Sequence, residues 1–278
     1  MTENLKEFDL VIEPGRSEKN YWNDLWRFRE LFLFMAWRDI LVRYKQTAIG
    51  LAWSIIRPVL TMLVFTVVFG RLAKLPSEGV PYPILVYAAL LPWQFFSTSF
   101  TDASASLIGN SNMLTKIYFP RLIIPVSTII VNLVDFFISF IILVGLMIWY
   151  NFVPGWTILY LPFFLFLAVV VSLSAGLYVA ALNVKYRDFK YIVPFVVQFG
   201  LYISPVGFSS SIVPEKWKLL YSLNPMVGII DGFRWSILGG KSQIYLPGMA
   251  LSILVVILIL IFSIRYFRKM EKTFADII

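Results

Sequence analysis

Long apolar stretches, separated by short charged or proline-containing segments, dominate the pattern along this chain. Six stretches are long enough to cross a bilayer, and they cover residues 50–69, 84–100, 122–149, 157–182, 191–208 and 246–267. A membrane-spanning helix needs about 20 apolar residues, because a rise of about 1.5 Å per residue has to cover a hydrocarbon core of roughly 30 Å. The pattern therefore predicts an all-α integral membrane protein with six transmembrane helices.

The segment before the first span, residues 21–46, carries charges too frequently to cross a bilayer. Arg27, Arg38 and Lys45 align on one face of a helix built from it. The apolar side chains gather on another face, about one third of the circumference, and comprise Trp22, Trp26, Leu33, Trp37, Ile40 and Tyr44. We predict an amphipathic helix that lies in the membrane interface. Two roles are open for it, namely a lipid-surface anchor that fixes the topology and a mechanical element.

The segment between the fifth and sixth spans is long and yet rich in aromatic and aliphatic residues. Pro214 and Pro225 each begin a short helix-forming stretch, and Gly239 and Gly240 end the second one. Neither stretch is long enough to span, so we predict a re-entrant helical hairpin before the last span. A membrane tolerates such a hairpin only where protein buries it or where it lines a cavity. The alternative is an amphipathic pair of helices that lies flat on the outer surface.

The loop between the second and third spans contains a helix-compatible stretch at residues 103–116, which Pro120 terminates. Its apolar side chains are Leu107, Ile108, Met113, Leu114 and Ile117. A short, partly apolar segment of this kind suits the docking of a partner. An ordinary connector is the alternative.

The composition leaves no room for a soluble catalytic domain. The chain has 278 residues, of which 59% are hydrophobic and 14% charged, whereas an ordinary soluble domain has about 25% charged residues. Six spans and their loops use nearly the whole length, and soluble domains mostly exceed about 50 residues. A function driven by ATP would take its ATPase from another chain. We divide the chain into an N-terminal segment (1–48), a transmembrane domain (49–267) and a tail (268–278).

The basic residues report the topology. An even number of spans places both termini on one side, and most lysines and arginines collect there. Those on the other side are Arg71, Lys74, Lys216, Lys218, Arg234 and Lys241. Because positive residues mark cytoplasmic loops, we predict that both termini are cytoplasmic. The first 20 residues also lack the apolar core of a signal peptide, and the net charge of +8 does not indicate a nucleic-acid surface.

Several reaction types are excluded by the residues themselves. The chain has no cysteine and no histidine, which removes disulfides, thiolate or imidazole metal sites and imidazole acid–base chemistry. Gly240-Lys241-Ser242 looks like the end of a phosphate-binding loop, but Trp235 stands where that loop requires glycine. No two carboxylates share a helical face, as a membrane-embedded enzyme would need. We expect no enzyme, and no metal or cofactor site, in this chain.

Three polar residues fall inside predicted spans. Asp135 lies near the middle of the third span with Asn132 on its face, and Arg57 precedes Pro58 in the first span. A carboxylate at mid-bilayer costs at least about 2.5 kcal/mol and has to face a partner or water. For Asp135 we favour an interhelical hydrogen bond or a pair with Arg57. A polar passage or a proton relay is the alternative.

Aromatic side chains are the other abundant signal, at 17% of residues. Most fit the aromatic belt of a membrane protein. Some surround Pro92 or the predicted hairpin, where their faces could contact the apolar faces of sugar rings without holding them. These candidates for a substrate pathway or gate are Trp93, Phe95, Phe96, Tyr202, Phe208, Trp217, Tyr221, Phe233 and Trp235.

Several short motifs follow one another along nearly the whole chain. They are Arg43-Tyr44-Lys45-Gln46-Thr47 with Gly50, Trp53 and Pro58; Pro92-Trp93 with Phe95-Phe96; Lys116 before Phe119-Pro120; Asn183 with Arg187-Asp188; Ser204-Pro205-Val206; and Leu223-Asn224-Pro225. In this order the chain resembles the permease subunit of type-2 ABC exporters. It is most similar to the group that exports lipid-linked O-antigen, capsular polysaccharide or teichoic acid, and the Arg-Tyr-Lys-Gln-Thr run is closest to the O-antigen branch.

The resemblance implies a bacterial inner-membrane protein that forms a channel as a homodimer. A separate pair of ABC ATPase subunits, with ATP and Mg²⁺, would dock on the cytoplasmic side. The amphipathic helix and the loop with Asn110, Asn112, Met113 and Lys116 would pass ATPase motion to the spans. The short helices within residues 213–238 would form an outer gate.

We hypothesise that the pyrophosphate of a polyprenyl lipid carrier meets clustered cations at head-group depth, namely Arg27, Arg38, Arg43 and Lys45. The function that follows is ATP-driven export of a lipid-linked polysaccharide, most similar to O-antigen. A small-molecule or drug efflux permease of the same fold is one alternative. A membrane-embedded enzyme acting on polyprenyl-linked sugars is another, although the clustered carboxylates that it would need are missing.

Overall fold

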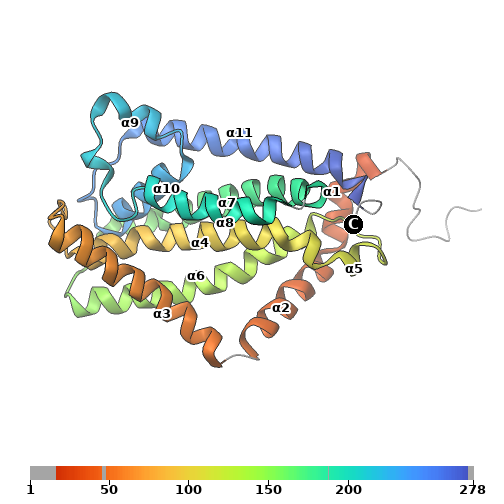
Figure 1. Cartoon of the computed structure of the whole chain (residues 1–278), viewed down its shortest axis with the longest axis horizontal. Coiled ribbons are helices and arrows are strands. Elements are labelled where there is room, and N and C mark those ends of the chain that lie inside the picture. Colours follow the sequence, from red (N-terminus) through yellow and green to blue (C-terminus); the bar gives the residue numbers. More distant parts are fainter. Residues whose placement is uncertain (1–16, 46–47, 187, 275–278) are drawn as a thin grey trace, which may run out of the picture.

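The computed structural model describes residues 17–45, 48–186 and 188–274, and every regular element in these ranges is a helix (Figure 1). In chain order the elements are α1 (Ser17–Arg27), α2 (Arg29–Lys45), α3 (Ala48–Phe65), the π-helix η1 (Thr66–Leu72), α4 (Tyr82–Gly109), α5 (Ser111–Leu114), α6 (Ile123–Trp149), the 3₁₀ helix η2 (Trp156–Tyr160), α7 (Leu161–Lys185), α8 (Phe189–Ile203), the 3₁₀ helix η3 (Ser210–Ile212), α9 (Glu215–Tyr221), α10 (Pro225–Ile237) and α11 (Leu246–Glu271). The all-helical fold class is confirmed. The motif residues Gln46, Thr47 and Arg187 lie outside the described residues, as do 1–16 and 275–278 of the two terminal segments.

Five helical stretches in the described part of the chain are long and apolar enough to cross a membrane. They are Ile55–Leu72, Tyr82–Gly109, Ile123–Trp149, Trp156–Lys185 and Leu246–Glu271, and they match five of the six predicted spans. The predicted span at residues 191–208 corresponds to α8, whose 15 residues rise only about 22 Å. α8 ends where Ser204 adopts an extended conformation (φ −79°, ψ 152°) before Pro205. A sixth crossing by α8 therefore stays a prediction.

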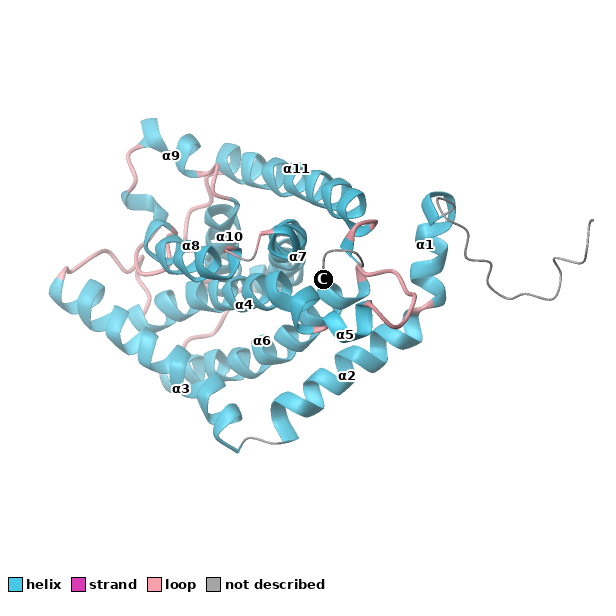
Figure 2. Ribbon diagram, turned by 45° about the vertical axis from the view of Figure 1, so that its right-hand side comes forward, coloured by secondary structure: helices cyan, strands magenta, loops and turns pink. Residues whose placement is uncertain are grey.

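Helix α4 is the central element of the bundle. It packs against α6, α7, α10, α3 and α8, and Figures 1 and 2 show it running between these helices. In its most apolar 18-residue stretch 72% of the residues are buried, against 17% to 39% in the other four candidate spans. Residues 84–91 of α4 are buried without interruption. Helices that are apolar all round belong in the interior, and the remaining spans therefore keep lipid-facing or partner-facing sides.

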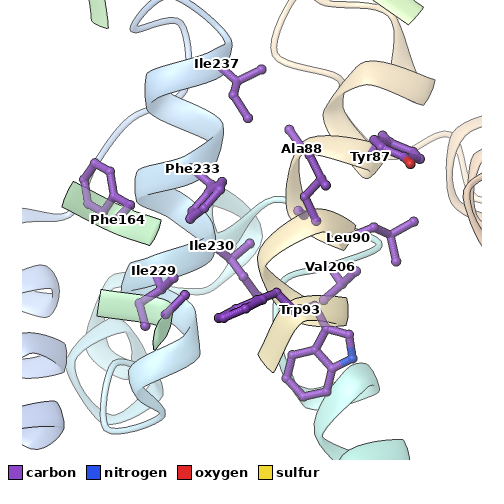
Figure 3. Packing of buried hydrophobic residues seen from close by; sticks show 14 of the residues in the cluster. Tyr87, Ala88, Leu90, Trp93, Phe164, Val206, Ile229, Ile230, Phe233 and Ile237 are labelled. Atoms are coloured by element: carbon purple, nitrogen blue, oxygen red, sulfur yellow. The ribbon is translucent and has the colours of Figure 1, made fainter. Parts of the chain in front are cut away.

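The core is built where α10 meets α4 and α7. Phe233 and Ile230 of α10 face Ala88 and Trp93 of α4 (Figure 3). Phe233 also lies edge-on to Phe136 of α6, with 6.1 Å between the ring centroids. The short helix α10 is thus buried by protein, which is the condition that the sequence analysis set for a non-spanning helix at membrane depth.

The two short helices between α8 and α11 begin where the prolines predicted. α9 follows Pro214, and α10 starts at Pro225, where the side chain of Asn224 accepts a hydrogen bond from the Met226 N–H at 3.0 Å. Gly239 and Gly240 follow α10 with positive φ angles of 67° and 80°, which glycine adopts without strain. The placement of this pair as a re-entrant hairpin stays a prediction.

The two segments predicted as single short helices differ from expectation. The amphipathic segment forms two helices, α1 and α2, which meet at Phe28. The indoles of Trp22, Trp26 and Trp37 are exposed by 55% to 71%, so that apolar side chains are available for a membrane surface or another chain. In the loop, α4 itself continues to Gly109, and only the four-residue α5 is separate.

Small residues let α4 and α7 pack closely. A Cβ atom added to Gly176 of α7 would lie 2.6 Å from the Cβ of Ala103 of α4. Glycine at such a crossing allows two backbones to approach, which is how helices associate tightly in membranes.

We expect Gly176→Ala to destabilise the protein, because the added methyl group has to push α4 and α7 apart. The midpoint of thermal unfolding in detergent should fall by several degrees, as for an overpacked site that costs about 1–3 kcal/mol. Gly145→Ala in α6 is the matched control, because nothing lies within 4 Å of its added Cβ, and it should leave the midpoint unchanged or raise it. Equal midpoints for both variants would contradict the close α4–α7 contact.

Candidate functional site

Five polar side chains from three helices form a cluster, which we name the Arg43 cluster. It contains Arg43 and Tyr44 of α2, Asp102 of α4, and Asn132 and Asp135 of α6. The Arg43 guanidinium donates to Asp135 and to Asn132 at 2.8 Å each and to Asp102 at 3.1 Å. Tyr44 donates to the second oxygen of Asp135, and the Asn132 amide donates to Asp102 at 3.1 Å. One cation is therefore shared between two carboxylates.

The geometry follows from helix spacing. Asn132 and Asp135 are three residues apart on α6 and therefore share a face, while Arg43 and Tyr44 are adjacent at the end of α2. The side chains of Arg43 and Asp135 are 36% and 22% exposed, so the pairs are partly desolvated. Charge-assisted hydrogen bonds of this kind are stronger than neutral ones. They offset the cost of placing Asp135 near the middle of a candidate span.

The interhelical hydrogen bond that we favoured for Asp135 is present. Its partners in the structure include Arg43 and Tyr44 of the N-terminal segment, while Arg57 on α3 has an exposed side chain. The convergence of Asp102 with Asp135 could not be read from the sequence, because the two carboxylates share no helix and only tertiary packing brings them together. Two residues of the Arg-Tyr-Lys-Gln-Thr motif, Arg43 and Tyr44, thus bind the amphipathic segment to α4 and α6.

The four cations proposed for a lipid carrier have different surroundings in the structure. Arg43 belongs to the Arg43 cluster, and Arg38 is paired with Asp39 at 2.7 Å. Arg27 and Lys45 have exposed side chains at the ends of α1 and α2, respectively.

The loop proposed for ATPase coupling contacts α2. Arg38 donates to the side chain of Asn110 at 3.4 Å, and Asn110 donates to the Ser106 carbonyl at 2.9 Å. Met113 packs against the buried cluster that contains Tyr21 and Met35. Asn112 and Lys116 are exposed. The loop is thus fixed on the inside by Asn110 and Met113, and it presents Asn112 and Lys116 to its surroundings.

At the opposite end of the bundle a fully buried arginine holds a loop in place. Arg234 of α10 donates to the carbonyls of Leu85, Phe208 and Val206 at 3.2, 2.6 and 2.9 Å. Tyr82 donates to the Gly207 carbonyl at 2.8 Å. Guanidinium has five N–H donors in a planar fork and can satisfy several carbonyls at once. We name Arg234 and the residues that it fixes, 204–208, the Arg234 clamp.

Two of the motifs that resemble type-2 ABC exporters, Ser204-Pro205-Val206 and Leu223-Asn224-Pro225, meet at the Arg234 clamp. The Asn224 amide donates to the Ser204 hydroxyl at 3.0 Å, and the Tyr221 hydroxyl donates to the Ile203 carbonyl at 2.7 Å. The Ser-Pro-Val and Leu-Asn-Pro motifs are therefore joined directly. The sequence analysis counted Arg234 only as an outer-side charge. Its position inside an otherwise apolar helix, three residues after Asp231, was the signal that could have identified it as a buried residue.

The aromatic candidates divide into buried and surface groups. Trp93, Phe95 and Phe233 are almost fully buried and pack in the main core. Phe96 and Trp235 pack against that core, and Trp235 contacts the ring of Tyr160 at 5.5 Å between centroids. Phe208 is half-buried, and its carbonyl accepts a hydrogen bond from Arg234. Within one chain these side chains do not form one continuous surface, because most of them hold helices together.

Tyr202 and Trp217 are the exposed members, at 61% and 52%. Trp217 lines a groove of about 330 Å³ with Tyr221 and Ile203, between the end of α8 and α9. Among the candidates, these are the side chains that a passing molecule could contact without separating helices.

Among the described residues no group of three or more Asp, Glu, His or Cys side chains could hold a metal ion. The Arg43 cluster is built from ion pairs, amide contacts and the Tyr44 hydroxyl, and the Arg234 clamp from hydrogen bonds to backbone carbonyls. Both arrangements join helices, and such arrangements can transmit or resist helix motion.

Comparison with known proteins finds membrane permeases as relatives of this chain. The chain is 27% identical to the O-antigen export system permease protein RfbA of Myxococcus xanthus, over 91% of this chain and 97% of that protein. It is 25% identical to the protein of the same name from Klebsiella pneumoniae, over 90% and 95%. It is also 25% identical to the inner membrane transport permease YadH of Escherichia coli K12, over 67% and 76%.

The family description of the ABC-2 type transporters matches residues 30–238, which include α2, the Arg43 cluster and the Arg234 clamp. A permease family, a helical bundle with several candidate spans and the near-complete coverage of permease relatives agree with one another. The chain belongs to the ABC-2 type transporter family.

Proposed function

We propose that this chain is the membrane subunit of an ATP-driven exporter that moves a lipid-linked polysaccharide, O-antigen, across the bacterial inner membrane. The observation that carries the proposal is the similarity to two O-antigen export permeases over at least nine-tenths of the chain. The absence of cysteine and histidine from the sequence is compatible with a passage that performs no chemistry. ATP and Mg²⁺ would be bound by a separate ABC ATPase pair.

The orientation of the chain is part of the proposal. The basic residues favour cytoplasmic termini, which places α1, α5 and the end of α11 on the side of the ATPase. Asn112 and Lys116 would then contact the ATPase, and α2 would lie at the membrane interface. The domain division at residues 48 and 267 follows from this orientation, with the channel-forming part between them.

The Arg43 cluster supports a route for motion. A displacement of the loop would reach α2 through the contact between Asn110 and Arg38. α2 is bound in turn to α4 and α6 through Arg43. Since α4 is the central helix, a shift at its inner half would act on the whole bundle.

A channel would require a second copy of the chain. α8 presents stacked, exposed Phe195 and Phe199, with 5.8 Å between their ring centroids. Only 17% of the most apolar stretch that begins in α3 is buried, and Arg57 is exposed on α3. An arginine inside a span has to face protein or water, which supports a paired arrangement with a lumen next to α3 and α8.

Inactivation of the gene in its native host tests the proposal. Surface polysaccharide should disappear, and carrier-linked polysaccharide should accumulate inside the cell, because synthesis continues without export. Both quantities can be measured by gel electrophoresis of lipopolysaccharide and by extraction of carrier lipids. Normal surface polysaccharide combined with raised sensitivity to toxic small molecules would instead establish the drug efflux alternative.

For the Arg43 cluster we expect Arg43→Gln to lower export severalfold while ATP hydrolysis continues, because two carboxylates lose their cation and α2 loosens from the bundle. Asp102→Asn introduced into this variant should restore part of the export, because it removes one of the uncompensated charges. Arg29→Gln, at an exposed arginine of the same helix, is the control and should behave as wild type. A loss of folded protein that equals the loss of export would show that the cluster only holds the fold.

For the outer groove we expect Trp217→Ala to slow export more than it reduces the amount of assembled complex. The reason is that an exposed indole can contact the passing glycan, while its removal leaves the core intact. Leu219→Ala, on the same helix and 50% exposed, is the matched control. Equal export rates for the two variants, measured at equal protein levels, would remove Trp217 from the pathway.

A further inference from the structure

One cleft among the described residues is lined by neither the Arg43 cluster nor the Arg234 clamp. It has a volume of about 840 Å³ and lies between α1, residues 114–121 and the last turns of α11. Figures 1 and 2 show α1, α5 and the end of α11 at the same end of the bundle. We name it the α11 cleft. Ligand sites in proteins are typically clefts of about 300–1,000 Å³, so it can hold more than one small group.

The walls of the α11 cleft are fixed to one another. The carboxylate of Glu271 accepts hydrogen bonds from the Arg121 N–H at 2.8 Å and from the Tyr21 hydroxyl at 3.4 Å. The guanidinium of Arg121 donates to the Glu271 carbonyl, and that of Arg268 lies 4.7 Å from the centre of the Tyr21 ring. Burial raises the pKa of the Tyr21 hydroxyl, which therefore remains a neutral donor. The cleft is thus pre-formed from three segments that are far apart in sequence.

The lining of the cleft has a strong excess of positive charge. Its cations are Lys116, Arg121, Arg265, Arg268, Lys269 and Lys272. Its carboxylates are Asp24 and Glu271, and the Glu271 carboxylate accepts the two wall contacts described above. An anion inside the cleft would be attracted by several charges from two different wall segments.

The position along α11 indicates the depth of the cleft. Residues 246–264 of α11 contain no charged side chain and rise about 28 Å, close to the thickness of a hydrocarbon core. Arg265 is the first charge after this stretch. It is therefore placed where lipid phosphates lie.

An exposed apolar stripe leads along α11 to these charges. Leu258, Ile261 and Phe262 are exposed by 43% to 57%. They are followed at helical spacing by Arg265 and Lys269, which are also exposed. Residues three or four apart share a helix face, so acyl chains could lie along the stripe while a head group enters the cleft. This continuity favours a lipid over an acidic segment of a protein partner.

We propose that the α11 cleft binds the head group of an acidic phospholipid of the cytoplasmic leaflet, with a two-phosphate head group such as that of cardiolipin as the best fit. Basic pockets at the cytoplasmic ends of transmembrane helices bind such head groups. The inference rests on the proposed orientation of the chain, but it does not depend on which substrate is exported.

The test uses the purified full-length chain in a neutral detergent, titrated separately with cardiolipin, phosphatidylglycerol and phosphatidylcholine, with bound lipid counted by native mass spectrometry. Wild-type protein should bind cardiolipin most tightly and phosphatidylcholine least. Arg265→Gln/Lys269→Gln should weaken cardiolipin binding by about tenfold or more, since two basic residues that attract the lipid head group are neutralised. Lys185→Gln/Lys190→Gln removes the same charge at exposed lysines outside the cleft and should change binding less than about twofold.

Three results would overturn the proposal. Equal losses in the two double variants would show that net charge alone attracts the lipid. Displacement of cardiolipin by polyprenyl pyrophosphate at lower concentrations than by phosphatidylglycerol would make the cleft a carrier site. Binding of the ATPase that is lost in Arg265→Gln/Lys269→Gln, while lipid binding is unchanged, would make it a protein interface. Because lipid binding is measured without transport, failure of this proposal is distinguishable from failure of the export function.

Discussion

A charged side chain inside a bilayer has to find its partner within the protein, and the pairing of Arg43 with Asp102 and Asp135 meets this constraint. The pairing draws the end of α2 against α4 and α6, although α2 is too rich in charge to cross the membrane itself. Without Arg43, the two carboxylates would be left uncompensated in a partly buried position. This guanidinium therefore joins the N-terminal segment to two helices of the bundle at once, beside the hydrogen bond from Tyr21 to Glu271 and the burial of Met35.

The same constraint shapes the other end of the bundle in a different way. There the chain leaves the helical conformation after α8, so that backbone carbonyls at residues 206–208 would lack partners in an apolar environment. Arg234 and Tyr82 supply the missing donors. The two ends therefore use an arginine differently. Arg43 is shared by two carboxylates at one end, and Arg234 is shared by backbone carbonyls at the other. Both arrangements join segments from several helices, and both involve residues of the motifs that resemble type-2 ABC exporters.

The helical class, five of the candidate spans and the start of α10 at Pro225 could be predicted from the sequence, because apolar length and proline position act locally. The split of the amphipathic segment at Phe28 and the continuation of α4 to Gly109 could not, because no proline marks either position and the packing of α2 on α6 and of α4 on α7 is not visible in the sequence. The burial of the aromatic candidates could not be predicted from the sequence either. Trp93 and Tyr202 are both aromatic and were both candidates for the pathway, yet Trp93 is buried in the core and Tyr202 is exposed at the surface.

The residue types and the length of the apolar runs were sufficient to predict a helical membrane protein, and the sequence contains no intact nucleotide-binding motif. Its motif order also pointed to the permease family that the comparisons established. Which polar residues meet, in contrast, follows from the packing of the helices. Asp102 and Asp135 are 33 positions apart, and Arg234 reaches a carbonyl 149 residues away. Hydropathy predicts which segments lie in the membrane. The pairing of charges depends on which helix faces are brought together.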